Sequence, residues 1–113
     1  MKVSFEGVGE QVLSFGKAEG VNKGSLVKIG ANASVSACAA GNKFAGVCIS
    51  ADGAFADVQT AGYVELGYTG TAPALGYANL VAANANAVKA DSTGREYLVI
   101  KVDTAAARVG FII

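Results

Sequence analysis

The stretch "FAGVCISADGAFADVQTAGYVEL", residues 44–66, decides the fold class. Short runs rich in Val, Ile, Phe and Tyr alternate here with turns that contain glycine. The Asp52-Gly53 pair between two such runs is a strong hairpin signal, because glycine adopts positive φ without steric cost. We expect Val47, Val58 and the neighbouring Ile49, Val64 and Leu66 to hold a small sheet. The predicted strands of this stretch are 44–50, 55–59 and 63–68.

The same pattern continues in both directions along the chain. Helical periodicity is nearly absent, and turn signals recur at the spacing of about 8–12 residues that is typical of small sandwiches and barrels. The sequence therefore predicts an all-β fold, a small single-domain β-barrel or sandwich of short antiparallel strands. The remaining predicted strands are 11–15, 25–29, 34–37, 79–83, 87–90, 96–103 and 108–113.

The run "EYLVIKVD" at 96–103 is the clearest of these strands. Because side chains alternate between the two faces of a strand, Leu98, Ile100 and Val102 share one face, which we assign to the core. The opposite face carries Tyr97, Val99 and Lys101.

The final run "RVGFII" is expected to pair with 96–103 or to close the sheet. Its residues Val109, Phe111 and Ile113 would lie on one face. The Ala-rich stretch 71–88 leaves room for one short helix, although Gly76 weakens that interpretation.

Length and composition favour one domain with a modest core. The chain has 113 residues, of which 52% are hydrophobic, but many of these are alanine, and glycine occurs 15 times. Small residues contribute little buried area, so we expect the chain to gain stability from neighbouring subunits. No internal repeat is evident in the sequence. We predict a single β domain over 1–113, in which 1–15 could form an extended N-terminal arm.

Charge and hydrophobicity argue against two classes of partner. Nine basic residues balance nine acidic ones, and the lysines never form a run, so neither nucleic acid nor an anionic membrane is an expected partner. No window approaches 18 continuous apolar residues, and residues 1–12 lack the apolar core of a signal peptide.

The chain contains no histidine, which removes the usual neutral-pH general base and every nucleophile–histidine arrangement. It also excludes metal sites that need imidazole. Cys38 and Cys48 are ten positions apart and form no CxxC motif. We interpret them as small buried apolar side chains in a reducing compartment. A cross-strand disulfide and a catalytic thiol are the alternatives.

The remaining acid and phosphate-binding patterns are weak. Asp57 and Glu65 lie at alternating positions of strands that we expect to be neighbours, and they fit a solvated strand face better than an acid–base pair. Gly7 and Gly9 begin a GxG pattern that lacks both the third glycine and a following Lys-Ser/Thr. We therefore expect no catalytic residue, no cofactor and no metal.

Tyrosines cluster around the long connection at 69–79. Tyr63, Tyr68 and Tyr77 could contact a partner protein, where tyrosine is enriched, or could stack on a sugar. We favour contact with protein. A loop of this length in a compact β domain is typical of a functional or interacting segment.

The run 24–66 resembles the small capsid decoration, or cement, proteins of tailed bacteriophages. In that family a Gly-x-Leu-Val strand is followed by a Val-centred strand, a Gly-Val strand, a turn and two further Val strands. The later Leu80, Val81, Val88 and "RVGFII" are similar to the family's C-terminal strands. The matching positions in the run are Gly24, Leu26, Val27, Val35, Gly46, Val47, Gly53, Val58, Gly62 and Val64.

The resemblance implies a non-enzymatic structural protein that binds the outside of a phage head and stabilises its lattice. It implies the major capsid protein as partner, a homotrimer on the capsid, and a location on the virion surface after assembly in the host bacterial cytoplasm. The family has no catalytic residues to carry over. By analogy, the N-terminal arm and the loop supply the capsid or trimer contacts, for which the candidates are Val3, Phe5, Val8, Tyr68, Pro73, Leu75 and Tyr77.

Two other functions stay open from the residues themselves. One is a small carbohydrate- or ligand-binding β module, on a phage tail or a cell surface, that uses the tyrosines. The other is a minor enzyme that uses Asp57 and Glu65. Glycan binding would favour the first, and a pH-dependent activity lost in both alanine variants would favour the second.

Overall fold

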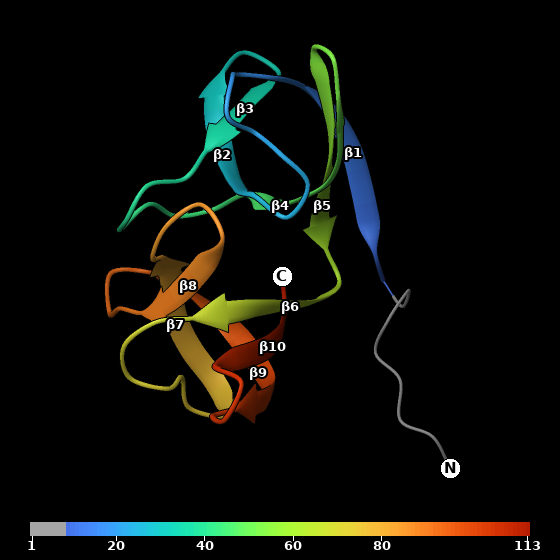
Figure 1. Cartoon of the computed structure of the whole chain (residues 1–113). Helices are drawn as coiled ribbons and strands as arrows, with labels where there is room; N and C mark the ends of the chain where they lie inside the picture. The colour runs from blue at the N-terminus through green and yellow to red at the C-terminus, as the bar shows by residue number, and fades with distance from the viewer. Residues whose placement is uncertain (1–8) are drawn as a thin grey trace.

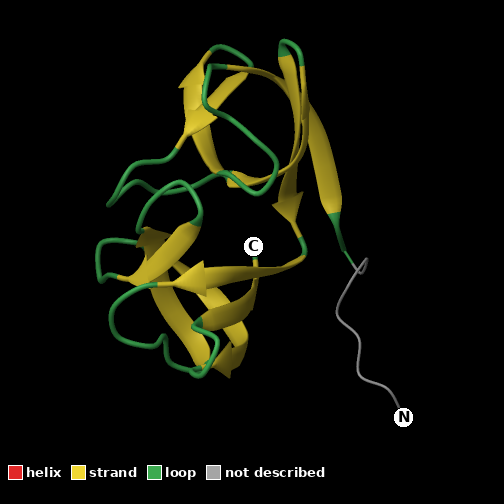
Figure 2. Ribbon diagram, in the orientation of Figure 1, coloured by secondary structure: helices red, strands yellow, loops and turns green. Residues whose placement is uncertain are grey.

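The computed structural model describes residues 9–113, and the regular elements among them are all β-strands (Figure 2). The strands form two small closed barrels, one above the other in Figure 1, each built from five consecutive strands. The predicted all-β class is confirmed. Within residues 9–113, no helix is long and apolar enough to cross a membrane.

The first barrel, barrel 1, has the strand order β1-β3-β2-β4-β5 and closes through the pairing of β5 with β1. β1 runs parallel to β3, and every other pair in the barrel is antiparallel. Its strands are β1 (Gln11–Lys17), β2 (Leu26–Ala31), β3 (Ser34–Ala37), β4 (Gly46–Asp52) and β5 (Phe55–Ala61).

The second barrel, barrel 2, has the order β10-β6-β8-β7-β9 and closes through the pairing of β9 with β10. Its only parallel pair is β6 with β8. Its strands are β6 (Tyr63–Tyr68), β7 (Gly76–Ala82), β8 (Ala87–Ala90), β9 (Arg95–Asp103) and β10 (Arg108–Ile112).

The two barrels repeat one topology, which the sequence did not reveal. Strands β1 to β5 correspond in order, direction and pairing to β6 to β10. The correspondence reaches single hydrogen bonds: the Lys17 amide donates to the Ala54 carbonyl over 3.0 Å, and the Tyr68 amide donates to the Ala107 carbonyl over 3.0 Å. Gly62 is the single residue between β5 and β6, so the two barrels follow each other almost without a linker.

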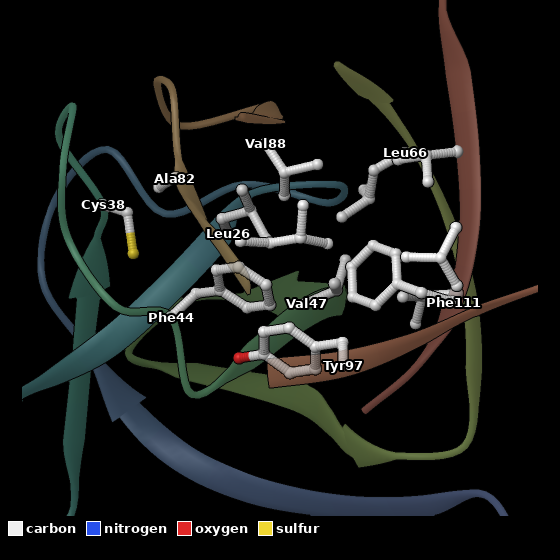
Figure 3. Close-up of a cluster of buried hydrophobic side chains, with 13 residues drawn as sticks. Leu26, Cys38, Phe44, Val47, Leu66, Ala82, Val88, Tyr97 and Phe111 are labelled. Atoms are coloured by element: carbon white, nitrogen blue, oxygen red, sulfur yellow. The ribbon is translucent and has the colours of Figure 1, made fainter. Parts of the chain in front are cut away.

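Each barrel has its own apolar interior, and the two interiors differ in size. Barrel 1 is filled by small side chains. Barrel 2 encloses an aromatic group in which the Phe44 ring stacks on Tyr97 at 5.1 Å, and both rings contact Phe111 (Figure 3). The buried residues of barrel 1 are Val21, Val27, Val35, Cys48, Ala56 and Val58.

The interior of barrel 2 also receives side chains from the first half of the chain. Leu26, Phe44 and Val47 are buried in the same cluster as the barrel 2 residues (Figure 3). Backbone hydrogen bonds hold the junction: the Leu26 amide donates to the Ala85 carbonyl over 2.7 Å, and the Ala82 amide donates to the Asn42 carbonyl over 2.9 Å. The barrels are therefore joined by shared apolar packing as well as by the chain.

The predicted core face of β9 is wrong at Leu98 but right at Val102, which packs against the core. Tyr97 and Val99 point into the core, whereas Leu98 is 38% exposed. The Tyr97 ring belongs inside because it completes the aromatic group with Phe44. A β-bulge then adds one residue, Ile100, between the pairs that Val99 and Lys101 form with β10, and this breaks simple alternation along the strand.

The same kind of bulge corrects the assignment of Ile49. Between the pairs that Cys48 and Ser50 form with β5, Ile49 is the extra residue, and it is exposed. The other expected core residues of this region are confirmed as buried. They are Val47, Val58, Val64 and Leu66.

Three further predictions concern the stretch 71–88, the last strand and the N-terminal arm. The stretch 71–88 forms β7 and β8 in place of a short helix. Val109 and Phe111 are fully buried and Ile113 packs against them, so the predicted face of the last strand is confirmed. Residues 11–15 belong to β1, which is one of the strands of barrel 1. The predicted N-terminal arm therefore cannot include them.

Candidate interaction surface

The carboxylates considered as an acid–base pair lie in different barrels. Asp57 is on β5 and accepts a hydrogen bond from the Ser14 hydroxyl over 2.5 Å. Glu65 is on β6, where it accepts a hydrogen bond from the Tyr63 hydroxyl over 3.0 Å and faces the Lys101 ammonium at 3.9 Å. The expectation that their strands are neighbours is wrong, because β5 ends barrel 1 and β6 begins barrel 2.

Cys38 and Cys48 are both buried free thiols, so the disulfide alternative is not realised. They belong to different apolar clusters, Cys38 at the junction and Cys48 inside barrel 1. Burial raises the pKa of the Cys38 thiol, against a smaller opposing effect of the Lys28 ammonium. The Cys48 thiol donates to the Ser50 carbonyl over 3.4 Å. Both side chains serve as packing groups.

Charged and metal-binding groups do not gather into a site in the part of the chain that the structure describes. Within residues 9–113, no three His, Cys, Asp or Glu side chains lie close enough to hold a metal ion.

Tyr97 is the titratable group of the aromatic cluster. Its burial raises its pKa, while the Arg95 guanidinium, 5.2 Å from the ring centroid, acts in the opposite direction.

The residues proposed from the sequence as contacts differ in accessibility. Tyr77 is 70% exposed and Leu75 is 68% exposed, so both can meet a partner. Tyr68 is half-buried and packs against the core of barrel 2, and Pro73 is buried, so Pro73 is not available for contact. The candidates Val3, Phe5 and Val8 lie outside the described residues.

Tyr77 belongs to an apolar row that crosses the outside of barrel 2. Tyr77 on β7 pairs with Leu98 on β9, and Leu98 pairs with Ile112 on β10. Ile112 pairs in turn with Tyr63 on β6. Leu75 immediately precedes β7 and extends the exposed apolar surface. We call Tyr77, Leu98, Ile112 and Tyr63 the barrel 2 row.

A polar row borders the barrel 2 row on the same outer face. Lys101, Gly110 and Glu65 are in register across β9, β10 and β6. A Cβ atom at Gly110 would collide with the Tyr63 hydroxyl, so glycine is needed for the tyrosine ring to lie across β10 and reach Glu65. Tyr63 is thereby fixed at the boundary between the apolar and polar rows.

Barrel 1 carries a second set of exposed apolar side chains. Phe55, beside the turn between β4 and β5, is 66% exposed, and Ile29 on β2 is 57% exposed. Val12 and Leu13 on β1 and Ile49 on β4 are also exposed. Each barrel therefore offers apolar surface to a partner, and apolar and aromatic residues of this kind are typical of interface centres.

Sequence reasoning found part of this surface. The long connection pointed to Leu75 and Tyr77, but Leu98 was assigned to the core, and neither Phe55 nor Ile29 was singled out. Phe55 is the first residue of β5, directly after the Gly53-Ala54 turn, so its side chain lies at the end of a hairpin. That position was a usable signal of exposure.

Comparison of the chain with protein-family models, with curated proteins and with solved structures finds no match. The two apolar surfaces and the topology that carries them are the features from which a function can be inferred.

Proposed function

We propose that this chain is a non-enzymatic structural protein that binds the outer surface of a tailed-phage capsid and stabilises its lattice. The observation that carries the proposal is the presence of exposed apolar side chains on both barrels of one compact body. Phe55 and Ile29 represent the surface of barrel 1, and Tyr77 and Leu98 represent that of barrel 2. A protein that fastens neighbouring subunits needs at least two such surfaces.

The junction between the barrels supports a fastening role. A link between two contacts transmits force only if its parts keep a fixed relation to each other. Leu26, Phe44 and Val47 of the first half are packed into the core of barrel 2, and backbone hydrogen bonds cross the same junction. A body of this kind can hold two partners at a set spacing, where a flexible linker would not.

The stabilising effect would follow from mass action. A protein that binds only the assembled lattice adds its binding free energy to the stability of that lattice. A homotrimer that engages several major capsid proteins at once has a higher effective concentration at each contact. The proposed site of action is the virion surface, reached by assembly in the host bacterial cytoplasm.

One observation favours a second function. The Tyr77 side chain is 70% exposed next to an apolar neighbour, and an exposed aromatic ring can stack on a sugar. A carbohydrate-binding module would use this ring alone, whereas a fastening protein would use the surfaces of both barrels. Binding to a glycan array that is lost in Tyr77→Ala and retained in Phe55→Ser would support the module.

The composition of purified virions tests the proposed function. Phage particles from the source host are isolated on a density gradient, and their proteins are identified and counted by mass spectrometry. We expect this chain at a copy number comparable with that of the major capsid protein. A few copies per particle would point to the tail, and absence from intact particles would contradict a role on the capsid.

A further inference from the structure

The first strand of barrel 1 has one edge that is only partly paired. β1 pairs with β5 along most of its length, from Gln11 to Gly16. Its other edge pairs with β3 at Gly16 and Lys17 alone. Residues 11–15 therefore have a strand on one side, and no strand of residues 9–113 pairs with their other side. In Figure 1 this part of β1 stands at the outer side of barrel 1, beside β5.

The backbone groups that point to this open edge follow from the pairs that do form. The Gly16 amide donates to the Ala33 carbonyl over 2.9 Å, on the β3 side. The β-bulge between β1 and β5 adds its extra residue, Thr60, to β5, so alternation along β1 is unbroken. Because alternate residues of a strand direct their backbone groups to the same edge, Val12 and Ser14 direct theirs to the side of β3. β3 does not reach them, so their N–H and C=O groups have no partner strand within residues 9–113.

The open edge is exposed on both faces of the strand. Val12 on the outer face is 41% exposed, and Leu13 is 44% exposed although it pairs with the buried Val58 on the inner face. Residues 11–15 contain no proline and no charged side chain. These are the devices with which proteins protect a free strand edge from pairing with another chain. Nothing in the strand itself therefore opposes the addition of a further strand.

On barrel 2 the corresponding edge is covered. Gly67 of β6 occupies the place of Gly16, because each pairs with the first residue of its parallel neighbour, β8 or β3, and with the first residue of its antiparallel neighbour, β10 or β5. Val64 therefore stands where barrel 1 has Leu13. Val64 is only 7% exposed, and it belongs to the cluster that fills barrel 2 and the junction.

A hydrogen bond also completes the edge of barrel 2. In the same register Tyr63 stands where barrel 1 has Val12. The Tyr63 carbonyl accepts a hydrogen bond from the side-chain amide of Gln59 over 3.1 Å, so barrel 1 satisfies this group. The other barrel thus supplies both apolar cover and a hydrogen bond to the start of β6. The start of β1 receives neither from residues 9–113.

We propose that residues 11–15 of β1 bind an extended segment of a partner protein, which adds a strand to barrel 1. Val12 and Ser14 exchange backbone hydrogen bonds with the segment, and its side chains pack on the two exposed faces. A row of unpaired backbone N–H and C=O groups selects another extended backbone as its ligand. This binding mode goes beyond the proposed function and does not depend on it, because the edge recognises main chain.

The side chains beside the edge determine what the segment carries. Its alternate residues lie over Leu13, and apolar side chains at those positions cover it. Glu10 directly precedes the edge, and Asp57 of β5 lies opposite Ser14. The basic Lys17 lies farther along, where β3 already pairs. Charge complementarity therefore favours a segment that has apolar residues at alternate positions and basic residues beside them.

Nuclear magnetic resonance of the full chain with a synthetic peptide tests the proposal. In the probe peptide valine alternates with threonine between two terminal lysines, and both ends are blocked. The amide resonances of Val12 and Ser14 should shift in a saturable way as peptide is added. Hydrogen exchange at these two amides should slow by at least about tenfold. The same peptide with N-methyl groups on the residues that face the edge should cause neither change.

Two substitutions at one position separate the edge from the side chain. Ser14→Pro removes the N–H that faces the edge, and proline is tolerated on an edge strand where this group is outside the ladder. Ser14→Ala is the matched control, because it removes the same hydroxyl, which donates to Asp57, and keeps the N–H. We expect Ser14→Ala to bind as the wild type does and Ser14→Pro to bind at least about tenfold more weakly. Val12→Pro replaces Ser14→Pro if circular dichroism shows that the latter is unfolded.

Three results would overturn the proposal. They are unchanged Val12 and Ser14 resonances at the highest soluble peptide concentration, equal binding by Ser14→Pro, and amides that are already protected in the chain alone. Protection that disappears when residues 1–8 are deleted would assign the edge to the chain's own N-terminal residues. Protection that rises with protein concentration would assign it to a second copy. The proposed function fails separately, by absence of the chain from virions, and that result leaves the binding mode intact.

Discussion

Barrel 1 and barrel 2 have the same strand order and directions, but the large side chains are placed differently in them. Where barrel 2 holds Tyr97 and Phe111 in its interior, barrel 1 has Gly46 and Val58 at the corresponding positions. A Cβ atom at Gly46 would collide with the Gln59 backbone and the Val58 side chain, so barrel 1 has no room for a larger residue there. One topology thus supports a narrow interior and a wide one.

The two barrels also differ in how much of their outer surface is covered. Leu26 and Val47 of barrel 1 are buried at the junction, whereas the residues that pair in the same way on barrel 2, Tyr77 and Leu98, are 70% and 38% exposed. Leu26 and Val47 therefore stabilise the fold, whereas Tyr77 and Leu98 on barrel 2 are available for binding. Whether an outward-facing residue is buried depends on whether the other barrel covers it. The local strand pattern does not show this.

Equivalent aspartate substitutions should separate these two roles most strongly. Val47→Asp buries an unpartnered carboxylate at the junction and should lower the free energy of unfolding by at least about 4 kcal/mol. Leu98→Asp keeps its carboxylate at the surface but loses the partial burial of Leu98, which is 38% exposed, and should lower it by about 1–2 kcal/mol. Urea unfolding of the two variants measures both. Similar losses at the two positions would contradict the difference between the buried junction and the exposed surface of barrel 2.

Truncation of the two interiors should give the next largest difference. Phe111→Ala removes a ring that contacts Phe44 and Tyr97 and should cost about 3–5 kcal/mol. The counterpart Val58→Ala removes two methyl groups and should cost about 2 kcal/mol. Denaturant unfolding of the two variants gives both values. A Val58→Ala loss as large as that of Phe111→Ala would show that barrel 1 is packed as demandingly as barrel 2.

Alkaline pH should destabilise the junction and barrel 2 selectively. The pKa values of Cys38 and Tyr97 are raised by burial above their ordinary 9.0 and 10.0, so unfolding releases protons in this range. Their contribution to stability is complete below these ordinary values and declines as pH rises through the higher folded pKa values. The thermal midpoint should therefore fall above pH 9.0.

The variants Cys38→Ala and Tyr97→Phe, which remove the two titrating groups, provide the control for the alkaline effect. Each should flatten the decline of the thermal midpoint with pH relative to the wild type. A decline of unchanged steepness in the double variant would show that other groups cause the alkaline loss.

The connections before β4 and β9 should differ slightly in acid. In barrel 2 the Thr93 hydroxyl and amide donate to the Asp91 carboxylate and lower its pKa below the ordinary 3.8. The stability that this carboxylate adds is present above pH 3.8 and is lost as pH falls through the lower folded pKa. Barrel 1 uses the Asn42 side-chain oxygen, which accepts from the Ala39 amide over 2.8 Å and does not titrate.

Asp91→Asn should therefore reduce the acid sensitivity of the thermal midpoint by a small amount, because Asp91 lies at the surface, where solvent screens its charge. Asn42→Asp is the matched change in barrel 1 and should introduce acid sensitivity there. An acid profile that neither substitution alters would remove this difference between the barrels.

Local features of the fold could be read from the sequence. The Asp52-Gly53 hairpin forms between β4 and β5, and Gly53 has the positive φ of 59° that favours glycine in such a turn. The face of β10 that carries Val109 and Phe111 is also as expected. Both follow from turn chemistry and short-range alternation, which depend on adjacent residues.

Features that depend on a partner strand or barrel could not be read in the same way. The bulges at Ile49 and Ile100 appear only when each strand is set against its neighbour. The repeat is hidden because corresponding positions hold different residues, as with Gly46 and Tyr97. Leu98 looks like a core residue in any strand pattern, and it is exposed because no other strand of residues 9–113 covers it.

Hydroxyl-radical footprinting of the wild type tests most directly the central claim that corresponding strands are covered on barrel 1 and exposed on barrel 2. It reports the solvent accessibility of single side chains, with Phe55 as an internal reference. We expect labelling of Tyr77 close to that of Phe55, and labelling of Leu26 and Val47 far below both. Strong labelling of Leu26 and Val47, or labelling of Tyr77 as weak as theirs, would contradict the account.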